Sequence, residues 1–368
     1  MIIATVAVLL VLTYTYVGYP IVIWMLAHLF PSEHVIDPKY APTVTICIAV
    51  HNGATYLENK LDSLVQLTYD PDKLEILVCS DGSTDTTADI MATHCARDSR
   101  IRFFELPRAG KATAINHLCE SSNGEILVMT DVRQPLHKDA VQKLVAPLSD
   151  PDVGCVSGFL EMPGSTVAGI YWRYERWIRD NESKFRSLTG VTGALYAIRR
   201  GDWPGIPPDI VLDDVWVPIL LRLQGYRILL ATDAIAYDKP ADVNREFDRK
   251  NRTLYGNYQL FFRLPQTLMP WTNPSFFEVF SHRILRLFGP WLLLLLLIIS
   301  ILAFSASTGA SQLALASLVA GQVAFYAAAL LGPGAGRIGN FARTFVVLNV
   351  SAVVGLWHFA RRKSWTVW

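Results

Sequence analysis

The middle of the chain alternates short apolar runs with segments whose apolar residues recur at helical spacing. The apolar runs predict strands at residues 44–50, 74–79, 101–105 and 126–129, and the segments between and after them predict helices at 54–67, 84–95, 110–120 and 139–148. Because strands that alternate with helices form parallel sheets with right-handed crossovers, we expect an α/β domain with a mostly parallel sheet.

Four further segments are apolar along most of their length. They lie at residues 1–30, 284–304, 312–331 and 344–360. A helix needs roughly 20 apolar residues to cross a bilayer. We therefore expect one N-terminal and three C-terminal transmembrane helices, and buried core helices are the alternative. The first segment has neither a basic start nor a small-x-small cleavage site, so we interpret it as a retained anchor.

These patterns divide the chain into four parts. We expect an N-terminal transmembrane helix at residues 1–30, a catalytic domain at 40–245, an interfacial segment at 246–282, and C-terminal transmembrane helices at 283–360. Residues 167–188 predict an amphipathic helix. Such a helix lies along a membrane face or over a binding site, or is an ordinary surface helix, and the pattern leaves both interpretations open.

The composition agrees with a membrane protein, because 51% of the residues are hydrophobic and only 18% are charged. The net charge of +1 argues against a nucleic-acid partner. The five cysteines are scattered and never spaced as C-x-x-C, so we expect neither a zinc site nor a disulfide framework. Their position in the hydrophilic middle of the chain fits a reducing, cytoplasmic location.

Polar side chains follow three of the expected strands. Asn52 follows the strand at 44–50, Asp81 follows the second strand, and Asp131 follows the strand at 126–129. Ligands of open α/β sheets bind at the carboxyl ends of the strands. The sequence therefore predicts a nucleotide pocket at this edge of the sheet.

With these features in order, the chain resembles the membrane-bound family 2 glycosyltransferases, the group that contains hyaluronan, chitin and cellulose synthases. The similarity covers roughly residues 43–290 and rests on an ordered set of motifs. The motifs are ICIAVHNGATYL at 46–57, LVCSDGSTD at 77–85, GKATAIN at 110–116 with GEILVMTD at 124–131, and LDD at 212–214 with GYR at 225–227. They are similar to the family's opening strand and turn, its D-D-G-S-T-D loop, its lysine helix with the metal strand, and its catalytic E-D motif with the G-Y-R that follows.

The resemblance implies a GT-A-type (Rossmann-like) fold and transfer of a sugar from a nucleotide-sugar, with UDP as the favoured nucleotide. The residues implied to bind the nucleotide-sugar are Val50, His51, Asn52, Asp81, Ser83, Lys111, Asn116, Asp131 and Arg133. Catalysis is implied for Asp213 and Asp214, and contact with acceptor or diphosphate for Gly193, Ala194, Arg249 and Arg252. Asp131 is the implied ligand of Mg²⁺ or Mn²⁺.

Two positions depart from the family's pattern. Its D-x-D motif reads Asp131-Val-Arg133, which leaves the need for a metal open. Arg133 could contact the phosphates itself or pair with a neighbouring carboxylate. The Q-x-x-R-W motif of processive synthases is reduced to residues 249–255 and lacks the Trp, which argues against polymer synthesis.

Each expected role has a structural alternative. We expect Asp214 to be the general base, which predicts inversion at the anomeric carbon, but with Asp213 it could merely stabilise a helix start. Asp81 is expected to bind uracil or ribose, or else to cap the next helix. Lys111 is expected to meet a phosphate at a helix N-terminus, or else to be solvated. His51 is expected to stack on the base.

Because nucleotide-sugars are cytoplasmic, we expect residues 40–280 to face the cytoplasm in a multi-pass inner-membrane protein. The leading hypothesis is an inverting hexosyltransferase that acts on a lipid-linked or growing glycan acceptor in polysaccharide or glycoconjugate synthesis. One alternative is a processive synthase that also secretes its polymer, for which several copies of the chain could build the pore. The other is a catalytically inactive nucleotide-binding scaffold.

Four crossings of the membrane would place Arg361, Arg362 and Lys363 outside, against the positive-inside rule, so the course of the last segment stays open.

Overall fold

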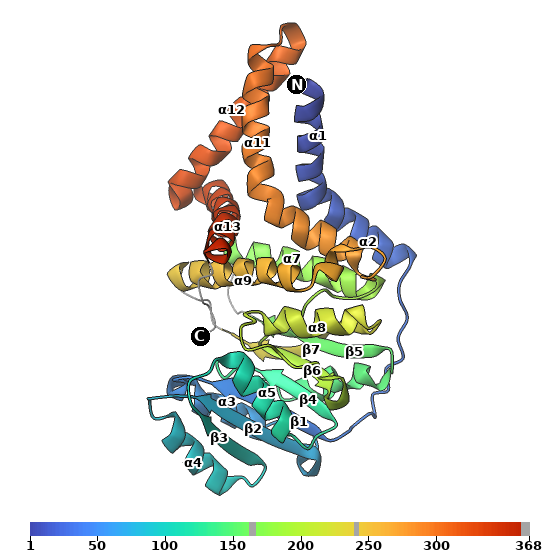
Figure 1. Cartoon of the computed structure of the whole chain (residues 1–368), viewed down its shortest axis with the longest axis vertical. Coiled ribbons are helices and arrows are strands. Elements are labelled where there is room, and N and C mark those ends of the chain that lie inside the picture. Colours follow the sequence, from blue (N-terminus) through green and yellow to red (C-terminus); the bar gives the residue numbers. More distant parts are fainter. Residues whose placement is uncertain (162–166, 239–242, 362–368) are drawn as a thin grey trace.

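The computed structural model describes residues 1–161, 167–238 and 243–361. A sheet domain forms one end of the molecule and apolar helices form the other (Figure 1). Helices α7 (Val167–Phe185) and α9 (Val243–Arg263) lie between the two. Of the three basic residues near the C-terminus, Arg362 and Lys363 lie outside the described residues.

The domain is built on one seven-stranded sheet of order β3-β2-β1-β4-β6-β5-β7. The strands are β1 Val44–Val50, β2 Leu74–Asp81, β3 Ile101–Leu106, β4 Ile126–Thr130, β5 Val153–Glu161, β6 Leu195–Arg199 and β7 Arg227–Tyr237. Strands β1 to β4 are parallel, and β5 is parallel to β7. Only β6 runs antiparallel to its neighbours β4 and β5. The expected mostly parallel α/β sheet is confirmed.

The helices of this domain cover both faces of the sheet. They are α3 Ala54–Val65, α4 Thr87–Arg97, α5 Lys111–Ser121, α6 Ala140–Val145 and α8 Asp213–Leu223. Alternate residues of β1 belong to different cores: Ile46 packs in the cluster that contains Leu61 of α3, and Cys47 packs in the cluster that contains Leu118 of α5. A parallel strand buried on both faces reads as a continuous apolar run, which is why β1 was visible in the sequence.

Four of the five cysteines pack in the core of the sheet domain. All five are free, and four of them are buried. Those four lie in the same cluster, on the face of the sheet covered by α5 and α8. They act there as small apolar side chains.

One N-terminal and three C-terminal apolar helices are present. The N-terminal segment comprises α1 (Ile2–Thr13) and α2 (Tyr19–Leu29), joined by a π-helical turn, and the others are α11 Leu285–Ser305, α12 Gly309–Leu331 and α13 Gly336–Ala360. A short helix, α10 (Phe276–Glu278), and a π-helical stretch precede α11.

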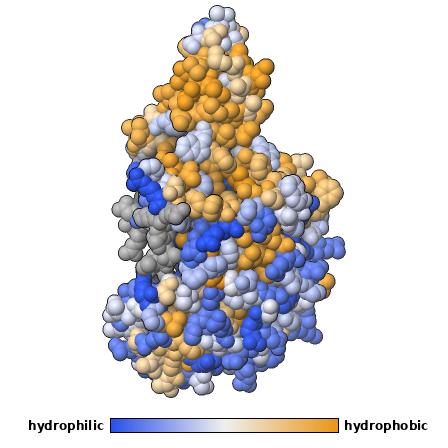
Figure 2. All heavy atoms as spheres, in the orientation of Figure 1, coloured by the Kyte–Doolittle hydropathy of each residue, from blue (hydrophilic) through white to orange (hydrophobic). Residues whose placement is uncertain are grey.

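In the part of the chain that the structure describes, three continuous helical segments are long and apolar enough to cross a membrane: residues 2–29, 276–305 and 309–360. Only 28%, 28% and 11% of their most apolar stretches are buried inside the chain, which excludes the alternative of core helices. Figure 2 shows this apolar surface at the end of the molecule opposite the sheet domain. The three segments suggest a membrane protein.

Candidate active site

Lys111 joins two carboxylates from different elements at the carboxyl edge of the sheet. Its Nζ lies 3.2 Å from Oδ1 of Asp131, which follows β4, and 3.3 Å from Oδ2 of Asp213, the first residue of α8. Burial alone would lower the pKa of Lys111, but Asp131 and Asp213 together raise it above its ordinary value. Lys111 is therefore a fixed cation, not the solvated lysine of the alternative interpretation.

Asp214 lies next to this ion pair in the first turn of α8. Burial, followed by the negative charge of Asp213, raises the pKa of Asp214 to about 6, and the charges of Lys111, Arg252 and Arg283 oppose the increase. The N-cap position of α8 is Leu212, which makes no side-chain cap. The two aspartates therefore do not cap the helix, although its dipole favours their negative charge.

Gly193 leaves space beside the Asp214 carboxylate. A Cβ built on Gly193 would lie 3.4 Å from Oδ2 of Asp214. The same loop is fixed to α8 by a hydrogen bond in which the Val191 amide donates to the Asp214 carbonyl oxygen at 2.8 Å. Ala194, the residue before β6, is buried, and its carbonyl oxygen accepts from the Thr130 hydroxyl. Gly193 thus leaves this side of the Asp214 carboxylate without a side chain of its own.

Asp81 is the last residue of β2 and is only 1% exposed. Its Oδ1 accepts hydrogen bonds from the backbone amides of Ala109, at 2.6 Å, and Gly110, at 3.0 Å. These amides come immediately before Lys111, and the loop can turn there because Gly110 has φ 96°. Asp81 thus holds the loop that positions Lys111, and its contact with uracil or ribose stays a prediction.

The helix that follows β2 does not use Asp81 as its cap. Asp85 serves this end of α4, because its Oδ1 accepts from the amide and the hydroxyl of Thr87. The capping alternative for Asp81 is therefore wrong.

His51, Asn52 and Ser83 surround Asp81 at the ends of β1 and β2. The ring Nδ1 of His51 lies 2.9 Å from the carbonyl oxygen of Asp81, and the Asn52 amide donates to the Ser83 hydroxyl. Asn52 has φ 50°, a strained value for a residue other than glycine. Val50, which precedes them, is fully buried. The three polar residues are brought together as the sequence predicts, and their contacts with a nucleotide stay predictions.

The side chain of Asn116 connects α5 to the segment before α8. Its Nδ2 donates to the carbonyl oxygen of Ile206, and its Oδ1 accepts from the Ile206 amide and the Trp203 indole. Both ends of the amide are used within the protein. The structure thus shows a structural role for Asn116, and its contact with the nucleotide-sugar stays a prediction.

Arg133 pairs with a neighbouring carboxylate, as the alternative interpretation has it. Its Nη2 donates to Oδ2 of Asp238 at 3.2 Å, and Gln134 donates to the same oxygen. The Arg133 side chain is still 45% exposed, so a phosphate could reach it from solvent.

Among the described residues, no group of three or more His, Cys, Asp or Glu side chains could hold a metal. Asp131 supplies a single carboxylate, whose side chain is 36% exposed and already lies beside Lys111. Mg²⁺ is often bound by one or two carboxylates together with substrate phosphates. The residues present therefore fit a divalent ion only jointly with the oxygens of a bound diphosphate.

The two predicted arginines of α9 face different neighbours. The charge of Arg252 lowers the pKa of Asp214, so this guanidinium lies near the site. The guanidinium of Arg249 instead lies 5.7 Å from the ring centroid of Trp172, on α7. α9 begins at Val243, so the helix includes residues on both sides of the expected domain boundary at 245/246.

Two basic residues near the site were not identified from the sequence. Arg283, in the stretch before α11, donates to the hydroxyl and the carbonyl oxygen of Thr189 and to Oδ1 of Asn257. Lys60 of α3 is fully buried and donates to the Thr130 hydroxyl and the Gln134 carbonyl oxygen, on either side of Asp131. Burial lowers the pKa of Lys60 to about 7. The sequence feature that could have identified Lys60 is its place among the apolar positions of α3, where a lysine is unexpected.

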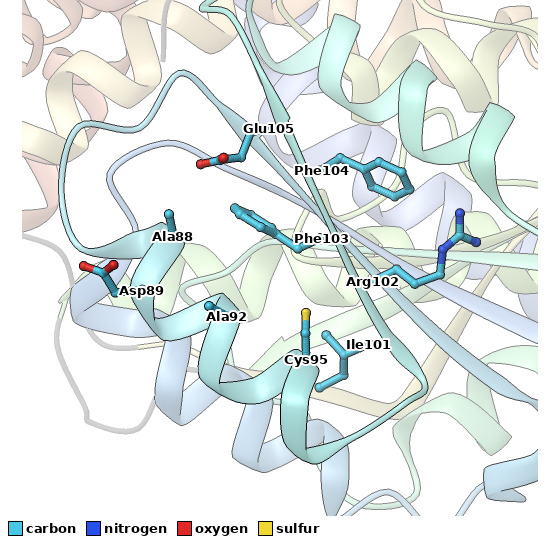
Figure 3. A pocket seen from close by; sticks show the side chains of 9 residues that line it. All are labelled: Ala88, Asp89, Ala92, Cys95, Ile101, Arg102, Phe103, Phe104 and Glu105. Atoms are coloured by element: carbon cyan, nitrogen blue, oxygen red, sulfur yellow. The ribbon is translucent and has the colours of Figure 1, made fainter.

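A separate hollow of about 630 Å³ lies between α4 and the edge strand β3. Figure 3 shows its lining, with Phe103 turned toward Ala88 and Ala92 of the helix. None of the predicted site residues lines this hollow. It therefore plays no part in the site built around Lys111.

Comparison with known proteins finds a known family domain in this chain. The family model described as "Glycosyl transferase family 2" matches residues 45–201. The "Probable glycosyltransferase YdaM" of Bacillus subtilis is 27% identical over 219 residues, which cover 55% of this chain and 51% of that protein. The "Hyaluronan synthase" of Pasteurella multocida is 31% identical over 134 residues, 35% of this chain and 14% of that protein. The matches thus span about half the length of the curated relatives, or less.

The fold as a whole is also found in a solved structure. This is the mannosyltransferase PcManGT from Pyrobaculum calidifontis, in complex with GDP-Man and Mn²⁺. The two chains superpose with a TM-score of 0.77 at 24% identity, over 97% of this chain and 99% of the other. The likeness confirms the expected GT-A-like fold. The family 2 glycosyltransferase domain at residues 45–201 and the curated relatives, by contrast, relate the chain to glycosyltransferases that include polysaccharide synthases.

Proposed function

We propose that the protein is an inverting glycosyltransferase that moves a sugar from a nucleotide-sugar, with UDP as the favoured nucleotide, to a lipid-linked or growing glycan acceptor at the cytoplasmic face of the membrane. The observation that supports this proposal best is the placement of Asp214 beside the Lys111 ion pair. A partly buried carboxylate with its pKa raised to about 6 and a fixed cation meet at the carboxyl edge of the sheet, where open α/β domains bind their ligands.

The proposed reaction is one in-line displacement. The acceptor hydroxyl forms a bond to the anomeric carbon, the bond from that carbon to the diphosphate oxygen breaks, and the hydroxyl proton passes to a carboxylate oxygen of Asp214. Negative charge builds on the leaving diphosphate, and Lys111 and Arg252 stabilise it. Attack from the face opposite the leaving group inverts the anomeric configuration.

A divalent cation fits this scheme as a second source of positive charge. Asp131 would hold Mg²⁺ or Mn²⁺ together with the donor's phosphate oxygens, and the ion would supply electrostatic stabilisation of the leaving group. Arg133 lies two residues further along, and its exposed guanidinium would add to the same field.

The test of this proposal is a screen of nucleotide-sugars with the purified full chain in detergent, with and without Mn²⁺. Transfer from one donor with inverted product stereochemistry supports the proposal. Absence of binding and turnover with every UDP- and GDP-sugar would overturn it. The length of the product distinguishes single transfer from processive synthesis. Processive synthesis remains the alternative because the chain is similar to polysaccharide synthases.

The rate of transfer is expected to rise with pH through about 6 and to level off above it. A general base works only in its ionised form, and the pKa of Asp214 is raised to about 6. The measurement is kcat/KM for the donor against pH. An acid limb centred near the ordinary pKa of an aspartate, about 4, would contradict the assignment.

Gly193→Val is expected to raise the acceptor KM by roughly tenfold or more, because a change of one methylene in a binding pocket is worth about 1–3 kcal/mol. A Cβ at this position would be in ordinary contact with the Asp214 carboxylate, and the methyl groups of valine would fill the space beyond it. Gly193→Ala is the matched control and should change KM little. Donor binding, measured by nucleotide titration, should be the same in both variants.

A further inference from the structure

A cavity of about 500 Å³ lies between the catalytic domain and the apolar helices. Its apolar wall comes from α11 and α13 and contains Leu287, Phe341, Phe345 and Leu348. Both helices belong to the segments that are apolar enough to cross a membrane. Phe341 is also 54% exposed, so this wall continues to the outer surface of the helices. Figure 1 shows α11 and α13 on the side of α7 and α9 away from the sheet.

Another part of the cavity lining contacts the backbone of α8, the helix that carries Asp214. It is formed by Thr189, Gly190 and Val191, and the Val191 amide donates to the Asp214 carbonyl oxygen. Arg283 holds this loop through Thr189. The lining of the cavity thus extends from the apolar helices to the loop that contacts the backbone of Asp214.

Basic residues outnumber acidic ones in the polar part of the lining. The four basic residues are Arg179, Lys250, Arg283 and Arg286, and the two acidic ones are Glu175 and Glu182. His282 lies between the two glutamates, with ring nitrogens 3.1 Å and 2.6 Å from their oxygens. Without counting the histidine, the lining therefore carries two more positive than negative charges, which favours an anionic group near the level of the membrane.

We propose that this cavity is the acceptor site and takes a lipid whose head group carries a phosphate ester and a sugar. The lipid chain lies against the wall of α11 and α13, the phosphate lies among the basic residues, and the sugar hydroxyl reaches Asp214 past Gly193. The volume falls within the usual range of small-molecule sites, about 300–1,000 Å³. The inference rests on the proposed transferase function and names the acceptor class for the same site.

The test is direct binding of farnesyl phosphate to the purified full chain in detergent, with farnesol and inorganic phosphate as probes that lack one half of the ligand. Farnesyl phosphate is expected to bind at least about tenfold tighter than either probe, a difference of about 1.4 kcal/mol. Equal affinity for farnesol would overturn the phosphate assignment, and equal affinity for inorganic phosphate would overturn the role of the apolar wall.

Two variants locate the binding. Leu348→Trp fills the apolar wall and should weaken binding of farnesyl phosphate about tenfold, whereas Val350→Trp, an exposed position on the same helix, should leave it unchanged. Lys250→Glu reverses one charge without altering the membrane helices and should reduce the preference for farnesyl phosphate over farnesol. Lys143→Glu, on the surface of α6, is its control. Unchanged binding in both Leu348→Trp and Lys250→Glu would place the lipid elsewhere.

The inference and the proposed function fail in different ways. A chain that binds farnesyl phosphate but transfers no sugar from any nucleotide-sugar would overturn the function and leave the cavity assignment intact. A chain that transfers sugar to a soluble glycan, but binds farnesyl phosphate no better than farnesol, would overturn the inference and leave the function intact.

Discussion

Replacing Asp214 with Asn is expected to lower kcat by about 10²–10⁴-fold, the usual contribution of a general base. Asparagine has nearly the same shape and can occupy the first turn of α8, but it cannot accept the proton of the acceptor hydroxyl. The measurement is single-turnover transfer from the nucleotide-sugar identified in the donor screen. The residual rate should also lose its dependence on pH near 6, because the group with the raised pKa is gone.

The control for this variant is Asp233→Asn, which removes an exposed carboxylate from β7. It should retain full activity. Nucleotide affinity should match the unsubstituted chain in both variants, which separates loss of the base from loss of the fold. A kcat for Asp214→Asn within a few-fold of the starting value would contradict the base assignment and favour the inactive-scaffold alternative.

The sequence predicted strands β1 to β4, because each of these four carried a local signal. The apolar run at β1 and the Asp131 that follows β4 were visible within short windows, and parallel strands bring their carboxyl ends to one edge. The position of β6 between β4 and β5 was not visible, because strand order depends on contacts between distant segments.

Residues of the candidate site that belong to a sequence motif were predicted. Residues that reach the site only through tertiary packing were missed. Lys111, Asp131 and Asp213 were identified from their motifs, and the structure brings them into contact. Arg283 was missed, because it lies far along the chain beyond α9 and reaches the site only when the stretch before α11 packs on the loop at Thr189. Helical periodicity alone gives no information about such contacts.

The role of Asn116 shows a second limit of motif reading. The motif placed it in the nucleotide site, but the structure uses its whole amide to connect α5 with the segment at Ile206. A short polar side chain on a helix can serve a ligand or a neighbouring loop, and the residue type is the same in both cases. Which role the side chain has is known only when its hydrogen-bond partner is known.

Replacing Lys111 with Met is expected to lower kcat by about 10²–10³-fold, the cost of losing one preorganised electrostatic donor. Lys111 is the cation that Asp131 and Asp213 share, so its loss leaves two carboxylates close together without a positive charge between them. Its charge also holds down the pKa of Asp214, so the acid limb of the pH–rate profile should move above 6 in the variant. This second shift separates a role in the charge network from a purely structural one.

Lys111→Arg should recover part of the rate and reverse the pH shift, because it restores the charge, and Lys143→Met on α6 should change neither quantity. An acid limb that stays in place in Lys111→Met would show that Lys111 does not act on the base, and its role would then be limited to the diphosphate.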